Sequence, residues 1–147
     1  MHKISVPIQL VDDELFPVYA TPWASGADAR AAIETAVTIE PGTSAIIPTG
    51  LRLELPVGFE MQVRPRSGFA AKNQVTVLNT PGTIDSDYRG EICVILINHG
   101  KEPFVVSPKM RIAQLVLSPV IQAEFQRVES LSFTQRGEGK FGYTGTQ

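Results

Sequence analysis

Short apolar segments, separated from one another by proline and glycine, make up most of this 147-residue chain, which holds 11 prolines and 12 glycines. Proline donates no backbone hydrogen bond and glycine supplies the positive φ of many tight turns, so both residues interrupt strands. Short strands at regular spacing with turn residues between them predict an all-β fold, either a sandwich or a jelly-roll-like distorted β-barrel. The predicted strands are 4–10, 37–39, 45–47, 52–55, 59–63, 91–98, 104–106, 111–117 and 123–128.

Length and charge narrow the classes of protein that fit. The chain length suits one domain with one core, which we expect residues 1–135 to form. A net charge of −2 and a pI of about 5.7 give no basic field for nucleic acid or a membrane surface. No apolar stretch approaches the roughly 20 residues of a membrane helix, and the N-terminus lacks the apolar core of a signal peptide.

The one cysteine, Cys93, lies in an apolar strand and predicts a buried, inert thiol in a reducing compartment. Together with the charge and the hydropathy, it leads us to expect a soluble cytoplasmic protein. We expect neither a nucleic-acid partner nor a membrane partner.

One helix is predicted, at 66–73, with Ser67 placed to cap its N-terminus. Free backbone N–H groups at a helix start favour an anion, and Arg66 adds a positive charge beside them. A plain helix cap is the simpler interpretation. The two interpretations are compatible, because a cap that faces a cleft can also hold a phosphate.

The stretch 75–91 predicts a bent β-hairpin with a type II turn at Pro81 and Gly82. An amide, carboxylates and an aromatic ring gather at or beside the bend, on Asn79, Asp85, Asp87, Tyr88 and Arg89. Held on a short rigid hairpin, such groups could bind a planar polar ligand. Asp and Asn are also ordinary turn residues, so a solvated hairpin tip is the alternative.

The C-terminal residues 136–147 set Arg136, Phe141 and Tyr143 among four glycines. The segment has no apolar periodicity, so we expect it to be mobile when nothing is bound. Glycine lets backbone N–H groups approach phosphate closely, arginine pairs with phosphate, and an aromatic ring can stack on a base. We therefore predict a flexible C-terminal lid, with a disordered end as the alternative.

Two more polar residues lie among small or apolar neighbours. Asp28 would need a partner if buried, and facing a cleft it could hold Mg²⁺ directly or through water. Gln114 is interpreted as a satisfied core amide. His2 and His99 lack the spacing of metal ligands and are expected at the surface.

The sequence shows no Ser-His-Asp arrangement or Cys-His pair, so covalent catalysis has no evident nucleophile. A positioned carboxylate, phosphate-binding groups and a metal site remain. That combination suits the attack of water on a phosphoanhydride.

Five stretches of the sequence, taken in order, resemble the five motifs of the trimeric dUTP pyrophosphatase (dUTPase) family. Together they span nearly the whole chain, and five motifs in order at family spacing are highly specific. They are S-G-A-D-A-R-A at 25–31, P-R-S-G at 65–68, L-N-T-P-G-T-I-D-S-D-Y-R-G-E at 78–91, R-I-A-Q-L-V at 111–116 and R-G-E-G-K-F-G-Y-T-G at 136–145. The chain departs from the usual pattern at Lys140, Tyr143 and Ala29.

The resemblance implies a jelly-roll homotrimer that hydrolyses dUTP to dUMP and pyrophosphate with Mg²⁺, at sites shared between subunits. Such an enzyme limits uracil incorporation into DNA and supplies dUMP for dTMP synthesis. Asp85 would be catalytic, activating the water that attacks the α-phosphorus, and Asp28 would anchor Mg²⁺ through its water shell.

The resemblance also assigns residues to each part of the substrate. Phosphates would be held by Arg66, Ser67, Gly68, Gln114 and Arg136. The deoxyuridine would be held by Asn79, Gly82, Thr83, Ile84 and Tyr88, with the Tyr88 ring excluding a 2′-hydroxyl. The closing tail would contribute Phe141, stacked on uracil, and Gly142.

Two other functions fit the same scaffold. A dCTP deaminase would release ammonia from dCTP and should lack an aromatic, glycine-rich tail of this form. A non-catalytic nucleotide-binding protein should have lost the base or the tail, and both are present in this sequence.

Overall fold

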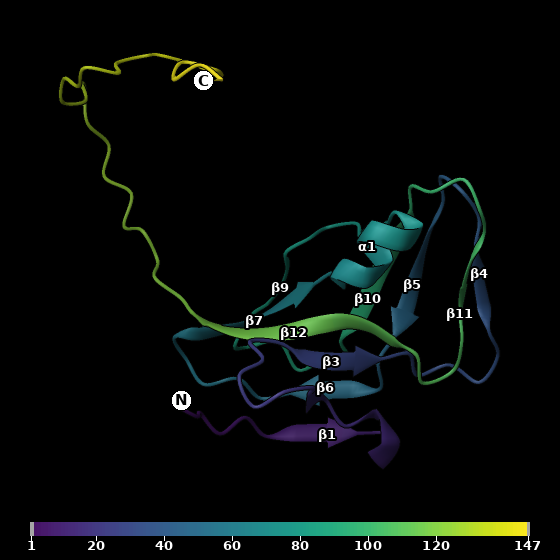
Figure 1. The fold of residues 1–147 in the computed structure, drawn as a ribbon. Coiled ribbons are helices and arrows are strands. Elements are labelled where there is room, and N and C mark those ends of the chain that lie inside the picture. Colours follow the sequence, from purple (N-terminus) through teal and green to yellow (C-terminus); the bar gives the residue numbers. More distant parts are fainter. Residues whose placement is uncertain (1, 147) are drawn as a thin grey trace.

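The structure of the chain is a computed structural model that describes residues 2–146. Its regular secondary structure is mostly short antiparallel strands, with one α-helix among the described residues, α1 (Ser67–Asn73), as Figure 1 shows. The strands are β1 (Ile8–Leu10), β2 (Val18–Tyr19), β3 (Ala27–Arg30), β4 (Val37–Ile39), β5 (Ser44–Pro48), β6 (Leu51–Leu53), β7 (Phe59–Arg64), β8 (Val75–Val77), β9 (Gly82–Ile84), β10 (Cys93–Asn98), β11 (Phe104–Val106) and β12 (Arg111–Pro119). A 3₁₀ turn, η1, spans Asp13–Leu15. The predicted all-β, jelly-roll-like fold is confirmed.

The strands form four sheets and do not close into one continuous barrel within the described residues. The largest has the order β2-β3-β12-β7-β9, and the next has the order β5-β10-β8. The pairs β1-β6 and β4-β11 complete the set. Strand β12 is central to the five-stranded sheet because it pairs with β3 on one side and β7 on the other.

One cluster of buried aliphatic side chains joins the sheets into a single core. The inward residues of β10 are Val94, Leu96 and Asn98, which alternate with outward residues as a strand requires. Asn98 is fully buried, and its amide donates to the carbonyl oxygens of Ile39 and Glu102. Strand β10, which the sequence predicts to be the most apolar strand, lies between β5 and β8 at the centre of its sheet.

The expectation that Cys93 is buried is wrong. Cys93 is exposed, because it shares the outward phase of β10 with Ile95 and Ile97. A continuous apolar run does not indicate which alternate residues of a strand face the core, since residues on both faces are hydrophobic.

The predicted hairpin at 75–91 is also wrong as a pairing. Strand β8 pairs with β10 and β9 pairs with β7, so the two segments belong to different sheets and the chain crosses over between them. Gly82 is paired opposite Val63 and its φ is not in the left-handed region. A Cβ at Gly82 would lie 3.0 Å from the Val63 Cβ, so the glycine permits close strand approach instead of a type II turn.

Ser67 does not cap the helix. The N-cap residue is Arg66, whose side chain makes no capping hydrogen bond, and Ser67 is the first helical residue. The Ser67 hydroxyl is therefore free of the capping role and lies beside the pocket described below. The helix ends at Gln74 in the left-handed conformation.

Residues 123–128 do not form the predicted strand. Beyond β12 the chain leaves the body of the molecule and stays exposed, as Figure 1 shows, with Ile121 and Phe125 each at least 95% exposed. An alternating segment becomes a strand only where another strand can pair with it, and this one has no paired neighbour among the described residues. Within residues 2–146, no helix has the length and apolar character needed to cross a bilayer.

Candidate functional site

A buried carboxylate organises the first group of predicted site residues. The Asp28 side chain is 5% exposed, and two guanidinium groups approach it, Arg111 from β12 and Arg66 from the start of α1. Arg111 Nη1 donates to Asp28 Oδ2 at 3.1 Å, and Arg66 Nε lies 3.5 Å from Oδ1. The Gln114 amide is 3.5 Å from the same Oδ1. The cluster carries more positive than negative charge and therefore favours an anion.

The sheet register explains why these groups meet. Asp28 of β3 is directly opposite Gln114 of β12, so their side chains share one face of the sheet. Gly26 lies against the Gln114 side chain, where a Cβ would come within 3.0 Å of the Gln114 Cβ. Arg66 reaches the same place from the start of α1, and its Nη1 donates to the Arg111 carbonyl oxygen at 3.2 Å.

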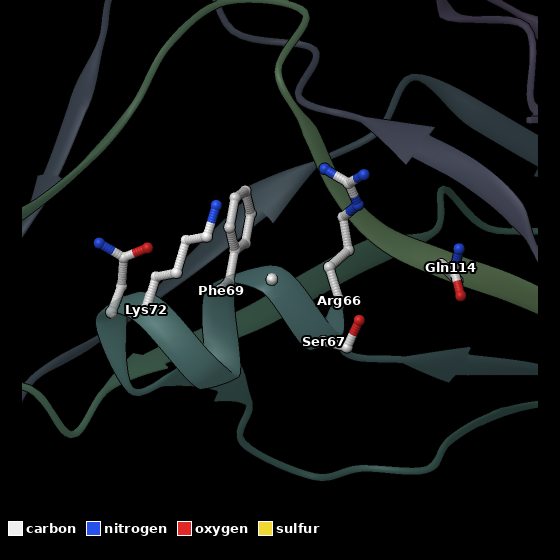
Figure 2. Close-up of a pocket in the computed structure, with 7 residues that line it drawn as sticks. Arg66, Ser67, Phe69, Lys72 and Gln114 are labelled. Atoms are coloured by element: carbon white, nitrogen blue, oxygen red, sulfur yellow. The ribbon is translucent and has the colours of Figure 1, made fainter.

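A cavity of about 320 Å³ opens above this cluster. Figure 2 shows the side chains that line it, with Arg66 and Ser67 at the start of α1, Gln114 on β12 and Lys72 further along the helix. Gly68 lines the cavity without a side chain to fill it. The pocket presents two cations, a hydroxyl and the two amides of Asn73 and Gln114, and such donors suit phosphate groups.

The Asp28 cluster limits how a metal ion could bind. Each Asp28 oxygen already has a guanidinium neighbour, and a cation in direct contact would lie beside both arginines. Among residues 2–146 no group of three or more His, Cys, Asp or Glu side chains could hold a metal. Direct coordination of Mg²⁺ by Asp28 does not fit, because the cation would lie beside both guanidinium groups.

A second group of predicted residues surrounds the turn at Asp85. Tyr88 N–H donates to the Asp85 carbonyl oxygen at 3.1 Å, and the Tyr88 hydroxyl donates to the Glu91 carbonyl oxygen at 2.9 Å. Gly90 allows this fold-back, because a Cβ there would lie 2.3 Å from the Tyr88 hydroxyl oxygen. Asp85 itself is exposed.

The Asp85 turn borders a separate cavity of about 350 Å³ that is apolar on its other side. Thr83 and Ile84 of β9 line it together with Asp85 and Tyr88. The remaining residues come from β5, from β10 and from the segment just before β10: Ile46, Cys93, Ile95 and Glu91. Partial burial of the Cys93 thiol, and then the charge of Glu91, raise the pKa of that thiol. Asn79 is exposed, and its amide nitrogen lies beside Gly82, 3.5 Å from where a Cβ there would be.

The third group, in the C-terminal tail, lies apart from both cavities. Phe141 is fully exposed, and neither Phe141 nor Gly142 lines either of the two cavities described above. The Arg136 side chain folds onto its own segment, with Nε donating to the Gly139 carbonyl oxygen and the guanidinium 5.7 Å from the Tyr143 ring. Figure 1 shows the tail well away from the sheets.

The predicted site residues therefore form three groups that do not meet within one chain. Arg66, Ser67, Gly68 and Gln114 line one cavity over Asp28, while Thr83, Ile84, Asp85 and Tyr88 line another. The two cavities share no lining residue.

Sequence reasoning missed the parts played by Arg111, Lys72, Gly26 and Gly90. Arg111 and Lys72 lie within or next to recognised motifs, so a cation close to a phosphate-binding motif is the signal that could have found them. The two glycines give no signal of their own, because their neighbours are set by the fold. The expectation of a core amide at Gln114 is replaced by a half-buried amide that faces the cavity.

The fold and the first cavity together define a jelly-roll-like protein with a cationic pocket suited to phosphate groups. A family model described as dUTPase matches residues 15–145, and the chain belongs to the dUTPase family. The resemblance carried by the five motifs is thereby confirmed.

Individual relatives agree with the family. A deoxyuridine 5'-triphosphate nucleotidohydrolase of Chlamydia pneumoniae is 62% identical over 130 residues, covering 88% of this chain and 90% of the relative. One of Bdellovibrio bacteriovorus is 52% identical over 147 residues, covering 99% of both.

Solved structures agree on the fold. A Staphylococcus bacteriophage 80alpha dUTPase with dUPNHPP matches at a TM-score of 0.84 and 24% identity, covering 98% of this chain and all of that one. A mutant dUTPase from phage phi11 of S. aureus, whose structure concerns the coordination of a structural Mg(II) ion, matches at a TM-score of 0.78 and 20% identity. It covers 88% of this chain and all of that one.

Proposed function

We propose that this protein hydrolyses dUTP to dUMP and pyrophosphate. The observation that carries the proposal is the cavity over Asp28, where Arg66, Ser67 and Gln114 offer phosphate donors in a chain of the dUTPase family. The curated relatives, named as deoxyuridine 5'-triphosphate nucleotidohydrolases, point to the same substrate.

The active unit is a homotrimer with sites shared between subunits. One chain contributes the phosphate cavity, a neighbour contributes the Asp85 turn, and a third contributes the tail. The separation of the three residue groups within one chain supports this arrangement. So does the apolar surface beside the Asp85 turn, where Ile46 is 68% exposed on a sheet that also turns Cys93 and Ile95 outward.

Hydrolysis proceeds by attack of water on the α-phosphorus. The Asp85 carboxylate accepts a proton from the water as its oxygen bonds to phosphorus, and the bond to the bridging oxygen breaks to release pyrophosphate. Exposure leaves the Asp85 carboxylate accessible to such a water. Arg66, Ser67, Gly68 and Gln114 hold the phosphates and stabilise the charge that develops on the leaving group.

A magnesium ion, bound to the substrate phosphates and reached by Asp28 through water, would supply charge neutralisation when present. The phi11 dUTPase, which has a similar fold, coordinates Mg(II) as a structural ion, so this fold can accommodate the metal. Without a metal, Asp28 contacts both Arg66 and Gln114, which supports a role in positioning them.

The segment from Asn79 to Tyr88 recognises the deoxyuridine of the substrate. The Asn79 amide and the backbone of Gly82, Thr83 and Ile84 offer a fixed hydrogen-bond pattern that suits uracil and leaves a cytosine donor unpaired. The Tyr88 ring, anchored through its hydroxyl to Glu91, packs under the sugar and leaves no space for a 2′-hydroxyl.

The chain divides into a β domain at 1–135 and a lid at 136–147 that closes over bound substrate. Met1 and Gln147, the outer ends of these two ranges, lie outside the described residues. Arg136 reaches the phosphates, Phe141 stacks on the uracil and Gly142 lets the backbone approach closely. The glycines at 137, 142 and 145 adopt positive φ, which supports a segment that can take up such turns.

The composition of the chain supports a cytoplasmic location. In the cell, the reaction would limit uracil incorporation into DNA and supply dUMP for dTMP synthesis. The test is a panel of nucleoside triphosphates with and without Mg²⁺, scored for pyrophosphate. We expect turnover of dUTP and little of dCTP, dTTP or UTP. Ammonia from dCTP would indicate a deaminase, and binding of dUTP without turnover would indicate a regulatory protein.

A further inference from the structure

We infer that Arg111 is a positioning residue for the phosphate cavity: it balances the charge of Asp28 and thereby leaves Arg66 and Gln114 available to the nucleotide. The inference rests on the proposed function, since it concerns the same cavity. Arg111 does not line the cavity itself, and the proposed function gives it no role.

The first argument is the charge balance at Asp28. A carboxylate that is only 5% exposed needs positive partners, because burial removes the water that would otherwise stabilise it. Arg111 makes the shorter of the two arginine contacts, 3.1 Å against 3.5 Å for Arg66. Arg111 is therefore the principal counter-charge of Asp28, and Arg66 is the weaker partner.

The second argument is how the donors of Arg66 are divided. Arg66 Nε faces Asp28 and Nη1 donates to the Arg111 carbonyl oxygen, so the main chain of Arg111 also fixes the guanidinium. Within the described residues these contacts leave Arg66 Nη2 for a ligand in the cavity that Arg66 lines. Figure 2 shows the guanidinium standing above Ser67 on the side of Gln114.

Loss of the Arg111 charge would change the positions of Arg66 and Gln114, the two side chains that hold the nucleotide in the proposed function. Asp28 would retain only Arg66 as a counter-charge and would draw that guanidinium into a closer, bidentate pair. The Gln114 amide, 3.5 Å from the same carboxylate, would be drawn toward it as well. The less balanced carboxylate would also repel the phosphates, so binding of the triphosphate would weaken while binding of the nucleoside would not.

The experiment measures binding of dUPNHPP to the full-length protein by calorimetry in EDTA, which removes any part that Mg²⁺ plays at Asp28. We expect Arg111→Gln to weaken binding roughly tenfold, the effect of losing one charge-assisted contact. Inhibition by deoxyuridine, which lacks phosphates, should stay within about twofold. Arg111→Lys, which keeps the charge, should restore most of the affinity.

The double variant Asp28→Asn, Arg111→Gln separates positioning from direct contact. Removal of both charges frees Arg66 again, so the double variant should bind dUPNHPP more tightly than Arg111→Gln alone. Because removal of the Asp28 charge relieves repulsion of the phosphates in any background, this gain is compared with the gain from Asp28→Asn alone. If Arg111 touched phosphate directly, or merely held the fold, the two gains would be equal, and that result would overturn the inference.

Other outcomes are equally decisive. Wild-type affinity in Arg111→Gln would overturn the inference and leave the proposed function intact, whereas failure of the wild-type protein to bind dUPNHPP would overturn both. Should Arg111→Gln not fold, Arg111→Lys becomes the test, and a loss of more than about tenfold there would contradict a charge-balancing role.

Discussion

The phosphate cavity and the Asp85 turn differ in how far a single chain completes them. Around the cavity, Asp28 is buried and joined to Arg66, Arg111 and Gln114 by side-chain contacts across two strands and a helix start. Asp85 lies on an exposed turn whose side chains face an open apolar surface. The comparison shows that the Asp28 cavity is organised within one chain, whereas Asp85 is left exposed. In the proposed trimer, a neighbouring chain would bring Asp85 to the cavity.

The largest effect should come from the incomplete region. Asp85→Asn removes the proposed base while keeping its shape, and we expect turnover of dUTP to fall about a thousandfold. Stopped-flow measurement of pyrophosphate release checks it, with Asp87→Asn as the matched control on the same exposed turn. Equal losses of turnover in the two variants would indicate a general charge effect and would contradict the role of Asp85 as the base.

Removal of residues 136–147 should have the next largest effect. The proposed lid supplies Arg136 and Phe141 only when substrate is bound, so we expect turnover to fall on the order of a hundredfold. Thermal unfolding should not change, because Phe141 is fully exposed and lines neither cavity. A truncated protein with full activity would show that the two cavities suffice without the tail.

A charge on the apolar surface beside Asp85 should separate the subunits. Ile46→Asp would place an unpaired carboxylate at a contact where burial costs about 3–5 kcal/mol, and we expect monomers by sedimentation. Turnover should fall more than about tenfold, since the two halves of the site no longer meet.

The matched control for that variant is Val105→Asp, an exposed position on β11 of the two-stranded β4-β11 sheet. It should leave both assembly and turnover unchanged. A monomeric Ile46→Asp protein with full activity would mean that the comparison between a complete and an incomplete region is mistaken.

The smallest effect should come from within the organised region. Gly26→Ala adds a Cβ within 3.0 Å of the Gln114 Cβ, and we expect a loss of about 1–3 kcal/mol in unfolding free energy. The KM for dUTP should rise as Gln114 moves. Gly68→Ala is the control for stability in chemical denaturation, since a Cβ there meets no atom within 4 Å. Equal stability of Gly26→Ala and wild type would show that the cavity wall is looser than its contacts indicate.

Much of the fold and the grouping of the cavity residues could be predicted from the sequence. Turn residues and apolar alternation locate most strands, and motif order brings Arg66, Ser67 and Gln114 to one place. Strand β3 was not predicted, because Ala27–Arg30 has two alanines and two charged residues where strands favour branched and aromatic ones.

What could not be predicted depends on contacts between distant parts of the chain. The segment 75–91 has the turn residues of a hairpin, yet its strands pair with β10 and β7, which no local pattern specifies. Arg111 is 83 residues from Asp28, so their ion pair follows only from the register of β3 and β12. The segment 123–128 has the alternation of a strand but no paired neighbour among the described residues.

The central claim is that a working site joins the phosphate cavity of one chain to Asp85 of another. Co-expression of Arg66→Gln and Asp85→Asn chains tests it, because each variant is inactive alone but intact where the other is damaged. With random assembly, half of the cavities and half of the Asp85 turns are intact, so about a quarter of the sites pair two intact halves. We predict about a quarter of wild-type turnover from the mixture, and turnover no higher than that of the separate variants would contradict the account.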